Sequence, residues 1–273
     1  MTAAAPTLPS GPRGARPGRV TPLAALRHAL LIARRNLLQI RSNPQLLIFI
    51  AIQPILFVLL FVYVFGGAIA GSSRQYVQFL IPGIVVQTVV FSTAYTGIGL
   101  NEDVNKGIVD RFRSLPIARS AVLAGRILAD AVRLVATVAL ILVVGTLLGF
   151  RITGGPPAAV AAFLLIVAFG MALSWPAAFI GLAVRNPETA QSAGFIWMFP
   201  LTFASSAFVA ASTMPGWLQP FVRLNPISVA ADALRGLLLG GPALAPALKT
   251  IAWTVGLTVV FAPLAILQYR RLA

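Results

Sequence analysis

Long apolar runs, separated by short polar connections, most limit how this chain can fold. Hydrophobic residues make up 58% of the 273 residues and charged residues only 10%, whereas soluble domains of this size carry about 25% charged residues. Several runs approach the roughly 20 residues that an α-helix needs to cross a bilayer. Within hydrocarbon, each helix satisfies its own backbone amides. The chain is therefore predicted to be an all-α membrane protein.

The runs predict six transmembrane helices. Pro or Gly interrupts most of them, which membrane helices tolerate where neighbouring helices satisfy the freed backbone groups. Residues 1–20 are rich in Pro, Gly, Ala and Arg and predict a disordered basic arm, so residues 21–273 form the membrane domain. The predicted spans cover residues 46–65, 76–98, 121–149, 158–184, 191–211 and 247–268.

The distribution of basic residues predicts the orientation. With a cytoplasmic N-terminus, the cytoplasmic segments hold fifteen Lys and Arg residues and the outer segments hold five. Because Lys and Arg accumulate on the cytoplasmic side, both termini are predicted to be cytoplasmic. The formal net charge is +15, and most of the basic residues that produce it lie outside the predicted spans. There they can contact the anionic headgroups of the membrane. We therefore expect membrane lipids, and not nucleic acid, as partners of these charges.

Several kinds of chemistry are excluded by composition. The chain has no cysteine and a single histidine, His28, so disulfides and cysteine-based metal sites are excluded and we expect no metal site and no catalytic residue. No G-x-x-x-x-G-K-[ST] loop for nucleotide phosphates is present. The D-x-x-D motif and paired histidines that a membrane-embedded lipid-modifying transferase would need are also absent.

Two segments predict amphipathic helices outside the spans. Residues 22–40 follow the start signal Thr21–Pro22 and carry an apolar stripe opposite basic residues, which is typical of a helix in the membrane interface; a soluble helix packed on a partner is the alternative. Residues 101–120 carry three of the six carboxylates on a mixed-charge helical face. Anionic headgroups would repel carboxylates, so this face predicts a short cytoplasmic helix that docks on a protein; a solvated loop is the alternative.

Two groups of charges are predicted to be structural. Asp130 in the third span has Arg126 at i−4 and Arg133 at i+3, which favours a self-neutralising clasp over a proton relay. Asp232 and Arg235 are three residues apart and can pair in the same way. They lie in a stretch bounded by Asn225–Pro226 and Gly240–Gly241, which predicts one short capped helix.

From about residue 21 onwards, the chain resembles the membrane subunit of type-2 ABC exporters, particularly the daunorubicin-resistance-like group of bacterial permeases. Four features carry the resemblance: the N-terminal interfacial helix, the loop "NEDVNKGIVDRFRSLPIARSAVLAGRILAD", the segment "MPGWLQPFVRLNPISVAADALRGLLLGG" and the basic tail "QYRRLA". The resemblance implies a place in the bacterial cytoplasmic membrane. It also implies two copies of a separate ATPase subunit that binds ATP and Mg²⁺, and a second permease chain, identical or a homologous sister. This chain would bind no cofactor itself.

In such exporters the interfacial helix and the loop after span two contact the ATPase. The run Glu102–Asp103 leaves open which carboxylate has the family's role. Carried onto this sequence, the ATPase-coupling residues are Arg34, Arg35, Glu102, Asp103, Lys106, Asp110, Arg111, Phe112 and Arg113.

The resemblance also places spans one, two and five at the interface of the permease pair, and makes residues 212–245 a re-entrant segment that caps the path; a helix lying on the outer surface is the alternative. Polar residues in spans face a cavity or another helix. The candidates for the path are Gln53, Gln87, Thr88, Ser92, Thr93, Thr96, Thr202, Ser205 and Ser206.

A path this apolar would suit a hydrophobic or amphipathic cargo. The resemblance implies that the cargo, such as a drug, a lipid or a lipid-linked molecule, is exported, and hence implies efflux and antibiotic resistance. The alternative function is a stand-alone secondary transporter or channel, which would move its solute without an ATPase. The spans do not place opposed carboxylates deep in the membrane, as ion-coupled transporters commonly do.

Overall fold

The computed structural model describes residues 44–66, 72–107 and 119–272, with side chains for residues 52–66, 72, 75–107 and 126–272. The predicted interfacial helix at 22–40 and the docking loop beyond Gly107 lie outside the described residues. So do the predicted coupling residues Arg34, Arg35, Asp110, Arg111, Phe112 and Arg113.

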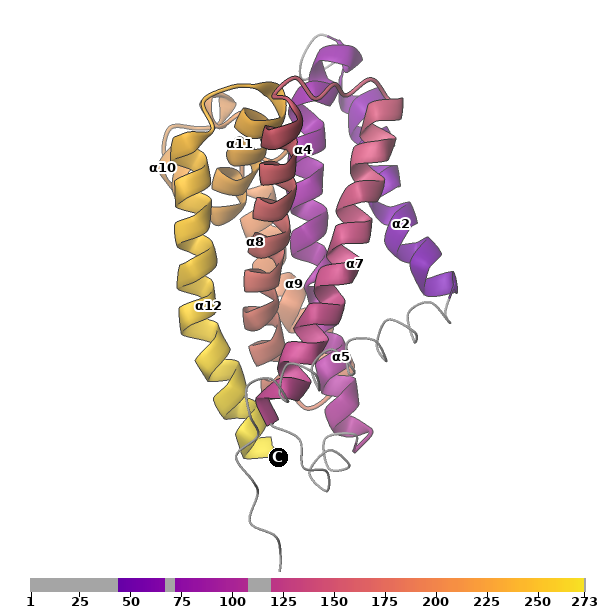
Figure 1. Ribbon diagram of the computed structural model, residues 1–273, viewed down its shortest axis with the longest axis vertical. Helices are drawn as coiled ribbons and strands as arrows, with labels where there is room; N and C mark the ends of the chain where they lie inside the picture. The colour runs from indigo at the N-terminus through magenta and orange to yellow at the C-terminus, as the bar shows by residue number, and fades with distance from the viewer. Residues whose placement is uncertain (1–43, 67–71, 108–118, 273) are drawn as a thin grey trace, which may run out of the picture.

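Every regular element in the described part of the chain is a helix. The long helices run side by side, and α5 and α12 end near the point where α7 begins, which we call the α5 end of the bundle (Figure 1). The opposite, α11 end carries α10, α11 and the start of α12. The elements are α2 (Pro44–Leu59), the π-helix η1 (Leu60–Phe65), α4 (Ser73–Ser92), α5 (Ala94–Asn105), α7 (Arg119–Leu147), α8 (Pro156–Ala183), α9 (Pro187–Phe203), the 3₁₀ turn η2 (Ala211–Thr213), α10 (Gln219–Leu224), α11 (Pro226–Leu239) and α12 (Leu244–Leu272).

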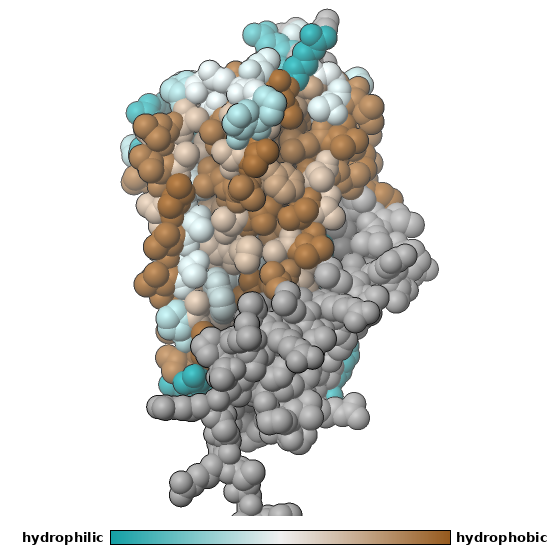
Figure 2. All heavy atoms as spheres, in the orientation of Figure 1, coloured by the Kyte–Doolittle hydropathy of each residue, from teal (hydrophilic) through white to brown (hydrophobic). Residues whose placement is uncertain are grey.

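Within the described ranges, four helices are long and apolar enough to cross a membrane: Gln75–Asn105, Arg126–Leu147, Pro156–Ala183 and Leu244–Leu272. Their surroundings differ, because 83% of the apolar window of the first is buried inside the bundle against 11% for the last. Figure 2 shows the hydrophobic face over α7, α8 and α12, with hydrophilic residues gathered at the α11 end. The chain is thus a multi-pass membrane protein. Helix α4 lies in the centre of the bundle, and α12 lies at its periphery with most of its surface exposed.

The second predicted span, 76–98, is longer than expected and is broken. Helix α4 ends at Ser92, where the Thr93 hydroxyl donates to the Val90 carbonyl at 2.7 Å, and α5 then continues to Asn105. The Thr96 amide donates to the Thr93 carbonyl in a tighter turn, so it bypasses the Ser92 carbonyl. The first residues of the predicted docking loop are therefore an extension of the span, and not a separate helix.

The fifth predicted span, 191–211, is wrong in its bounds. Helix α9 begins at Pro187 and ends at Phe203, three residues after the internal Pro200. The side-chain amide of Asn225 donates to the Leu201 carbonyl at 2.7 Å and to the Ala204 carbonyl at 2.8 Å. In a longer helix these carbonyls would accept hydrogen bonds from backbone amides of the next turn. The Asn225 side chain takes the place of those amides, which stabilises the end of α9 at this point.

Helices α5 and α8 cross with their backbones in contact. A Cβ atom on Gly97 would lie 2.4 Å from the Ala177 carbonyl oxygen, and one on Gly181 would lie 2.2 Å from the Gly97 carbonyl oxygen. Small residues allow such close approach between membrane helices. This crossing fixes α5 against α8 directly below the break at Thr93.

Candidate functional site

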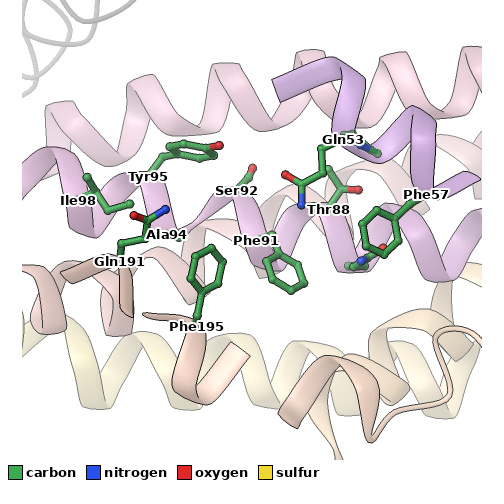
Figure 3. A pocket seen from close by; sticks show the side chains of 12 residues that line it. Gln53, Phe57, Thr88, Phe91, Ser92, Ala94, Tyr95, Ile98, Gln191 and Phe195 are labelled. Carbon is green, nitrogen blue, oxygen red and sulfur yellow. The ribbon is translucent and has the colours of Figure 1, made fainter. Parts of the chain in front are cut away.

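A pocket of about 70 Å³ lies between α2, α4, α5 and α9. Figure 3 shows its side chains converging from these helices. Four aromatic rings and five uncharged polar side chains line it, together with Pro54, Ala94 and Ile98, and none of these described residues is charged. The rings belong to Phe57, Phe91, Tyr95 and Phe195, and the polar side chains to Gln53, Gln87, Thr88, Ser92 and Gln191.

The pocket brings together four of the path candidates and leaves the others elsewhere. Gln53, Gln87, Thr88 and Ser92 line it, although they come from two separate spans. Thr93 is buried with its hydroxyl on the α4 backbone. The expected neighbours from span five, Thr202, Ser205 and Ser206, do not line it, because the chain leaves α9 at Phe203 and carries the two serines to the α11 end. Which of these residues contact cargo stays a prediction.

Sequence reasoning missed the aromatic half of the pocket. The predicted path residues are all polar, whereas Phe91, Tyr95 and Phe195 also line the pocket. A usable signal was present, because Phe91 and Tyr95, like Phe195 and Phe199, are spaced four apart and so share one helical face. The Phe91 ring lies 5.2 Å from Phe199 and 6.0 Å from Phe195 between centroids.

The wall of the pocket contains a hydroxyl without a partner. Ser92 is 5% exposed, and its Oγ makes no hydrogen bond within the described structure. Most buried polar side-chain atoms have a partner, so the Ser92 hydroxyl is an unused hydrogen-bonding group in a residue that lines the pocket. Its own carbonyl, by contrast, accepts a hydrogen bond from Arg133 at 2.9 Å.

A buried ion pair from α7 supports the wall at the helix break. Arg133 contacts Asp130 at 2.9 Å, and the Thr96 hydroxyl donates to the other carboxylate oxygen at 2.5 Å. The guanidinium lies 5.4 Å from the centroid of the Tyr95 ring. Together these contacts join α7 to both sides of the break at Thr93.

The predicted clasp of Arg126, Asp130 and Arg133 is only partly right. Arg133 pairs with Asp130, but Arg126 instead reaches Asp103 on α5 at 2.9 Å. Gly99 makes this possible, because a Cβ atom there would lie 1.7 Å from the Arg126 guanidinium. The second oxygen of Asp130 is taken by Thr96. Arg126 is therefore a tie between α5 and α7.

The α5 end of the bundle holds the three predicted coupling residues that the structure describes. Asp103 is engaged with Arg126, whereas Glu102 pairs with Lys106 at 2.7 Å, with side chains 43% and 61% exposed. The hydrogen bond from Lys106 to Glu102 raises the pKa of the lysine. Asn101 donates to the carbonyls of Gly181 and Val184 at 2.9 and 2.7 Å. Helix α5 is thus held to α7 and to the end of α8, and the side chains of Glu102 and Lys106 lie on its exposed side.

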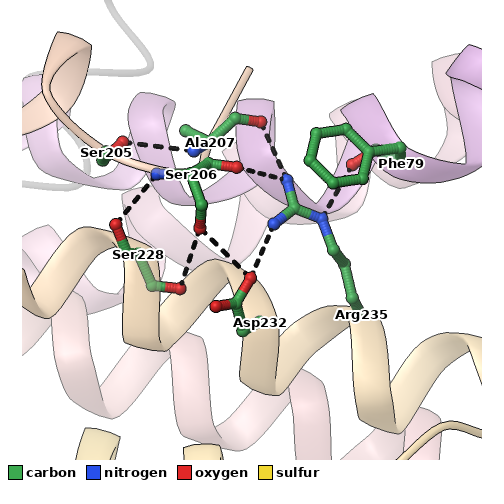
Figure 4. Close-up of polar contacts among 7 residues, drawn as sticks. All are labelled: Phe79, Ser205, Ser206, Ala207, Ser228, Asp232 and Arg235. Atoms are coloured by element: carbon green, nitrogen blue, oxygen red, sulfur yellow. Dashed lines mark hydrogen bonds and ion pairs between the residues drawn. The ribbon is translucent and has the colours of Figure 1, made fainter. Parts of the chain in front are cut away.

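A second polar cluster lies at the α11 end (Figure 4). Arg235 donates to Asp232 at 2.8 Å, as predicted, and also to the backbone carbonyls of Phe79, Ser206 and Ala207 at 3.0, 2.8 and 2.9 Å. Its guanidinium lies 3.6 Å from the centroid of the Phe79 ring. One side chain thereby fixes α11, α4 and the segment after α9 together.

Helix α11 itself agrees with its predicted bounds. The Asn225 side chain accepts from the Ile227 amide at 2.9 Å, and Gly240 ends the helix with φ of 76°. Ten of its fourteen residues are buried, so α11 is packed into the bundle and does not lie on an outer surface.

Comparisons with known proteins identify the family of this chain. The model of the ABC-2 type transporter family matches residues 27–239. The chain is 42% identical over 258 residues to the daunorubicin resistance ABC transporter permease protein DrrB1 of Streptomyces coeruleorubidus, over 94% of this chain and 90% of that protein. It is 31% identical over 222 residues to the "Probable doxorubicin resistance ABC transporter permease protein DrrC" of Mycobacterium tuberculosis, over 81% and 80%. The doxorubicin resistance permease DrrB of the same organism is 29% identical over 206 residues, or 72% and 70%. The chain therefore belongs to the ABC-2 type transporter family.

Proposed function

We propose that this chain is the permease subunit of an ATP-driven exporter that moves a hydrophobic or amphipathic drug out across the cytoplasmic membrane. The observation that carries the proposal is the continuity of α5, which begins in the pocket wall at Ala94 and Tyr95 and runs through Asp103 to its end at Asn105, in the predicted coupling region. A displacement of its exposed end would be transmitted to the pocket, because the helix is short and held on two sides.

The count of Lys and Arg along the whole sequence, fifteen against five, supports the orientation in which the α5 end faces the cytoplasm. Basic residues mark the cytoplasmic side of membrane proteins. Among described side chains, the α5 end carries Lys106, Arg126, Arg185, Arg270 and Arg271, and the α11 end carries Arg151, Arg223, Arg235 and Lys249. In this arrangement the chain crosses the membrane six times: by the four long helices, by α2 with η1, and by α9 with the segment after it.

The chemistry of the pocket supports an aromatic, amphipathic cargo. Aromatic rings favour offset or edge-to-face contacts with other rings, and the glutamine side chains both donate and accept hydrogen bonds. The names of the relatives contain daunorubicin and doxorubicin, so drugs of this kind are the cargo to test. The pocket lies on the face of α2, α5 and α9 that we assign to the second permease chain of the exporter.

The energy for transport comes, in this proposal, from a separate ATPase subunit, two copies of which act on the permease pair. A ligand shifts a conformational equilibrium only by its differential affinity for the two states. ATP and Mg²⁺ bound to the ATPase subunit provide this difference in affinity. The resulting displacement of α5 reaches the pocket, and the contacts of Arg126 and Asn101 hold the end of α5 against α7 and α8.

The pair between Asp103 and Arg126 gives a direct test. The variants Asp103→Arg and Arg126→Asp each place like charges together, so we expect both to reduce ATP-dependent drug uptake into inverted vesicles that contain the chain and an ABC ATPase. The exchanged double variant restores the attraction and should recover uptake. Recovery would show that the single variants lose uptake because the ion pair is lost and not because the chain fails to fold. Unchanged uptake in both single variants would contradict the role of α5.

The same vesicles test the alternative of a stand-alone transporter or channel. Vesicles that contain the chain without an ATPase, or with an ATPase but no ATP, should show no uptake above that of empty vesicles. Uptake by the chain alone would overturn the proposed function.

A further inference from the structure

An open groove of about 370 Å³ lies at the α11 end, between α10, α11 and α12. It shares no lining residue with the pocket between α2, α4, α5 and α9. Its lining consists of two basic side chains and four apolar ones: Arg223, Leu224, Val229, Lys249, Ala252 and Trp253. The proposed transport cycle makes no use of this groove.

The two basic residues of the groove carry positive charge that the described chain does not neutralise. Within the described residues, the Arg223 side chain donates a hydrogen bond to the neutral side chain of Gln219 at 3.3 Å, and neither Arg223 nor Lys249 forms an ion pair with a described carboxylate. Asp232 lies on α11 as well, but it is held by Arg235. The groove therefore favours an anionic group.

The apolar residues of the groove fit a lipid better than a soluble anion. Trp253 follows Lys249 by one turn of α12, so the two side chains share one face of the helix. Counting about 1.5 Å per residue, Lys249 lies nearer the start of α12 and Trp253 deeper along the bundle. Leu224 and Trp253 are 73% and 40% exposed. Tryptophan is enriched at membrane interfaces, and α12 has little cover from the rest of the chain.

We propose that this groove binds an anionic phospholipid. The lipid phosphate lies between Arg223 and Lys249, and an acyl chain follows Leu224, Ala252 and Trp253 towards the centre of the bilayer. Because the groove is lined by residues of α10, α11 and α12, the bound lipid also contacts all three helices and stabilises their packing. The proposal rests on the membrane placement of the chain in its proposed function, and not on the cargo or the ATPase.

The test measures lipid binding to the purified full chain in detergent by native mass spectrometry, with phosphatidylglycerol and phosphatidylcholine of the same acyl chains as probes. We expect a preference for phosphatidylglycerol that weakens with salt, because ion contacts at a surface are screened. The double variant Arg223→Gln/Lys249→Gln should bind phosphatidylglycerol about 25-fold more weakly, since each basic residue near an anionic surface contributes about a factor of five.

A matched control removes two exposed arginines outside the groove, Arg151→Gln/Arg185→Gln, and should retain the preference. Equal losses in both double variants, or no preference in the unmodified chain, would overturn the proposal. Soluble glycerol phosphate separates the headgroup from the lipid. If it displaced phosphatidylglycerol at equal concentration, the apolar half of the groove would play no part and the lipid assignment would be wrong.

A second measurement does not depend on the charge variants. Phosphatidylglycerol brominated on its acyl chain should quench the fluorescence of Trp253, and the variant Trp253→Phe should lose that part of the quenching. Equal quenching in both proteins would place the acyl chain elsewhere. All of these experiments omit ATP, cargo and the ATPase, so a failure of the transport proposal would leave their outcome intact.

Discussion

Arg133 and Arg235 each follow by three residues the aspartate with which they pair, yet the two pairs have different surroundings. Arg235 uses all three of its guanidinium nitrogens, on Asp232 and three backbone carbonyls, and stacks closely on Phe79. Arg133 contacts Asp130 and one carbonyl, its Nε has no partner within the described structure, and the nearest ring, Tyr95, is further away.

The difference separates a fixed region from one that has room to rearrange. The Arg235 cluster satisfies its polar groups and joins three segments, so any movement there breaks several hydrogen bonds at once. The Arg133 pair lies beside a helix break, a pocket and the unpartnered Ser92 hydroxyl. Local openings occur where fewer interactions must be broken. We therefore expect conformational change at the pocket and not at the α11 end.

The largest expected effect is that of Arg235→Met. The variant leaves three backbone carbonyls without their donor, and each unsatisfied buried group costs about 1 to 3 kcal/mol, so we expect a loss of about 4 kcal/mol. Asp232 contributes less to this loss, because its side chain is 51% exposed and still accepts from the Ser206 hydroxyl. Thermal or denaturant unfolding of the detergent-solubilised chain measures the loss. The control Arg151→Met, at an exposed arginine, should change the free energy of unfolding by less than about 0.5 kcal/mol. Similar losses of unfolding free energy in both variants would contradict the role of Arg235 in holding the α11 end together.

A smaller but still large effect is expected for Asp130→Asn. Arg133 then keeps a buried charge without its counterion, at a cost of about 3 kcal/mol, but the amide oxygen still accepts one hydrogen bond. Adding Arg133→Met to this variant should recover part of the loss, because the unpaired charge is gone. A double-mutant cycle of unfolding free energies measures the coupling. Strictly additive losses would mean that the two residues do not act as a pair.

The pair at the α5 end should contribute less to stability. Arg126 and Asp103 are 19% and 25% exposed, so solvent screens their attraction, and Asp103→Asn is expected to cost about 1 kcal/mol or less. The same unfolding measurement applies. A loss as large as that of Asp130→Asn would show that the α5 end is as rigid as the buried cluster and would weaken its proposed role in coupling.

The smallest expected effect on stability is that of Ser92→Ala, which removes a hydroxyl that has no partner. We expect a change within about 0.5 kcal/mol. Ser228→Ala is the matched contrast, because its hydroxyl accepts from the Ser206 amide at 2.8 Å in the Arg235 cluster, and a lost hydrogen bond costs about 1 kcal/mol or more. If Ser92→Ala were the more destabilising of the two, the hydroxyl would have a structural partner after all.

The sequence predicted the features that depend on near neighbours. Runs of apolar residues indicated membrane helices, Asn225–Pro226 and Gly240 bounded α11, and the spacing of Asp232 and Arg235 indicated their pair. Such signals are local, because a helical cap needs two or three residues and an i,i+3 pair needs one turn. The six-span count and the roles of the site residues stay predictions.

The contacts between distant segments were decided only by the tertiary structure. Arg126 pairs with Asp103 because Gly99 has no side chain in its way, and α9 ends where Asn225 donates to its last carbonyls. The pocket is lined by aromatic rings from four helices. In an amphipathic soluble helix the polar face reveals which side is buried. Lipid and protein interior are equally apolar, so in these spans the sequence determined that helices form, and only their packing determined which side of each helix faces lipid, core or pocket.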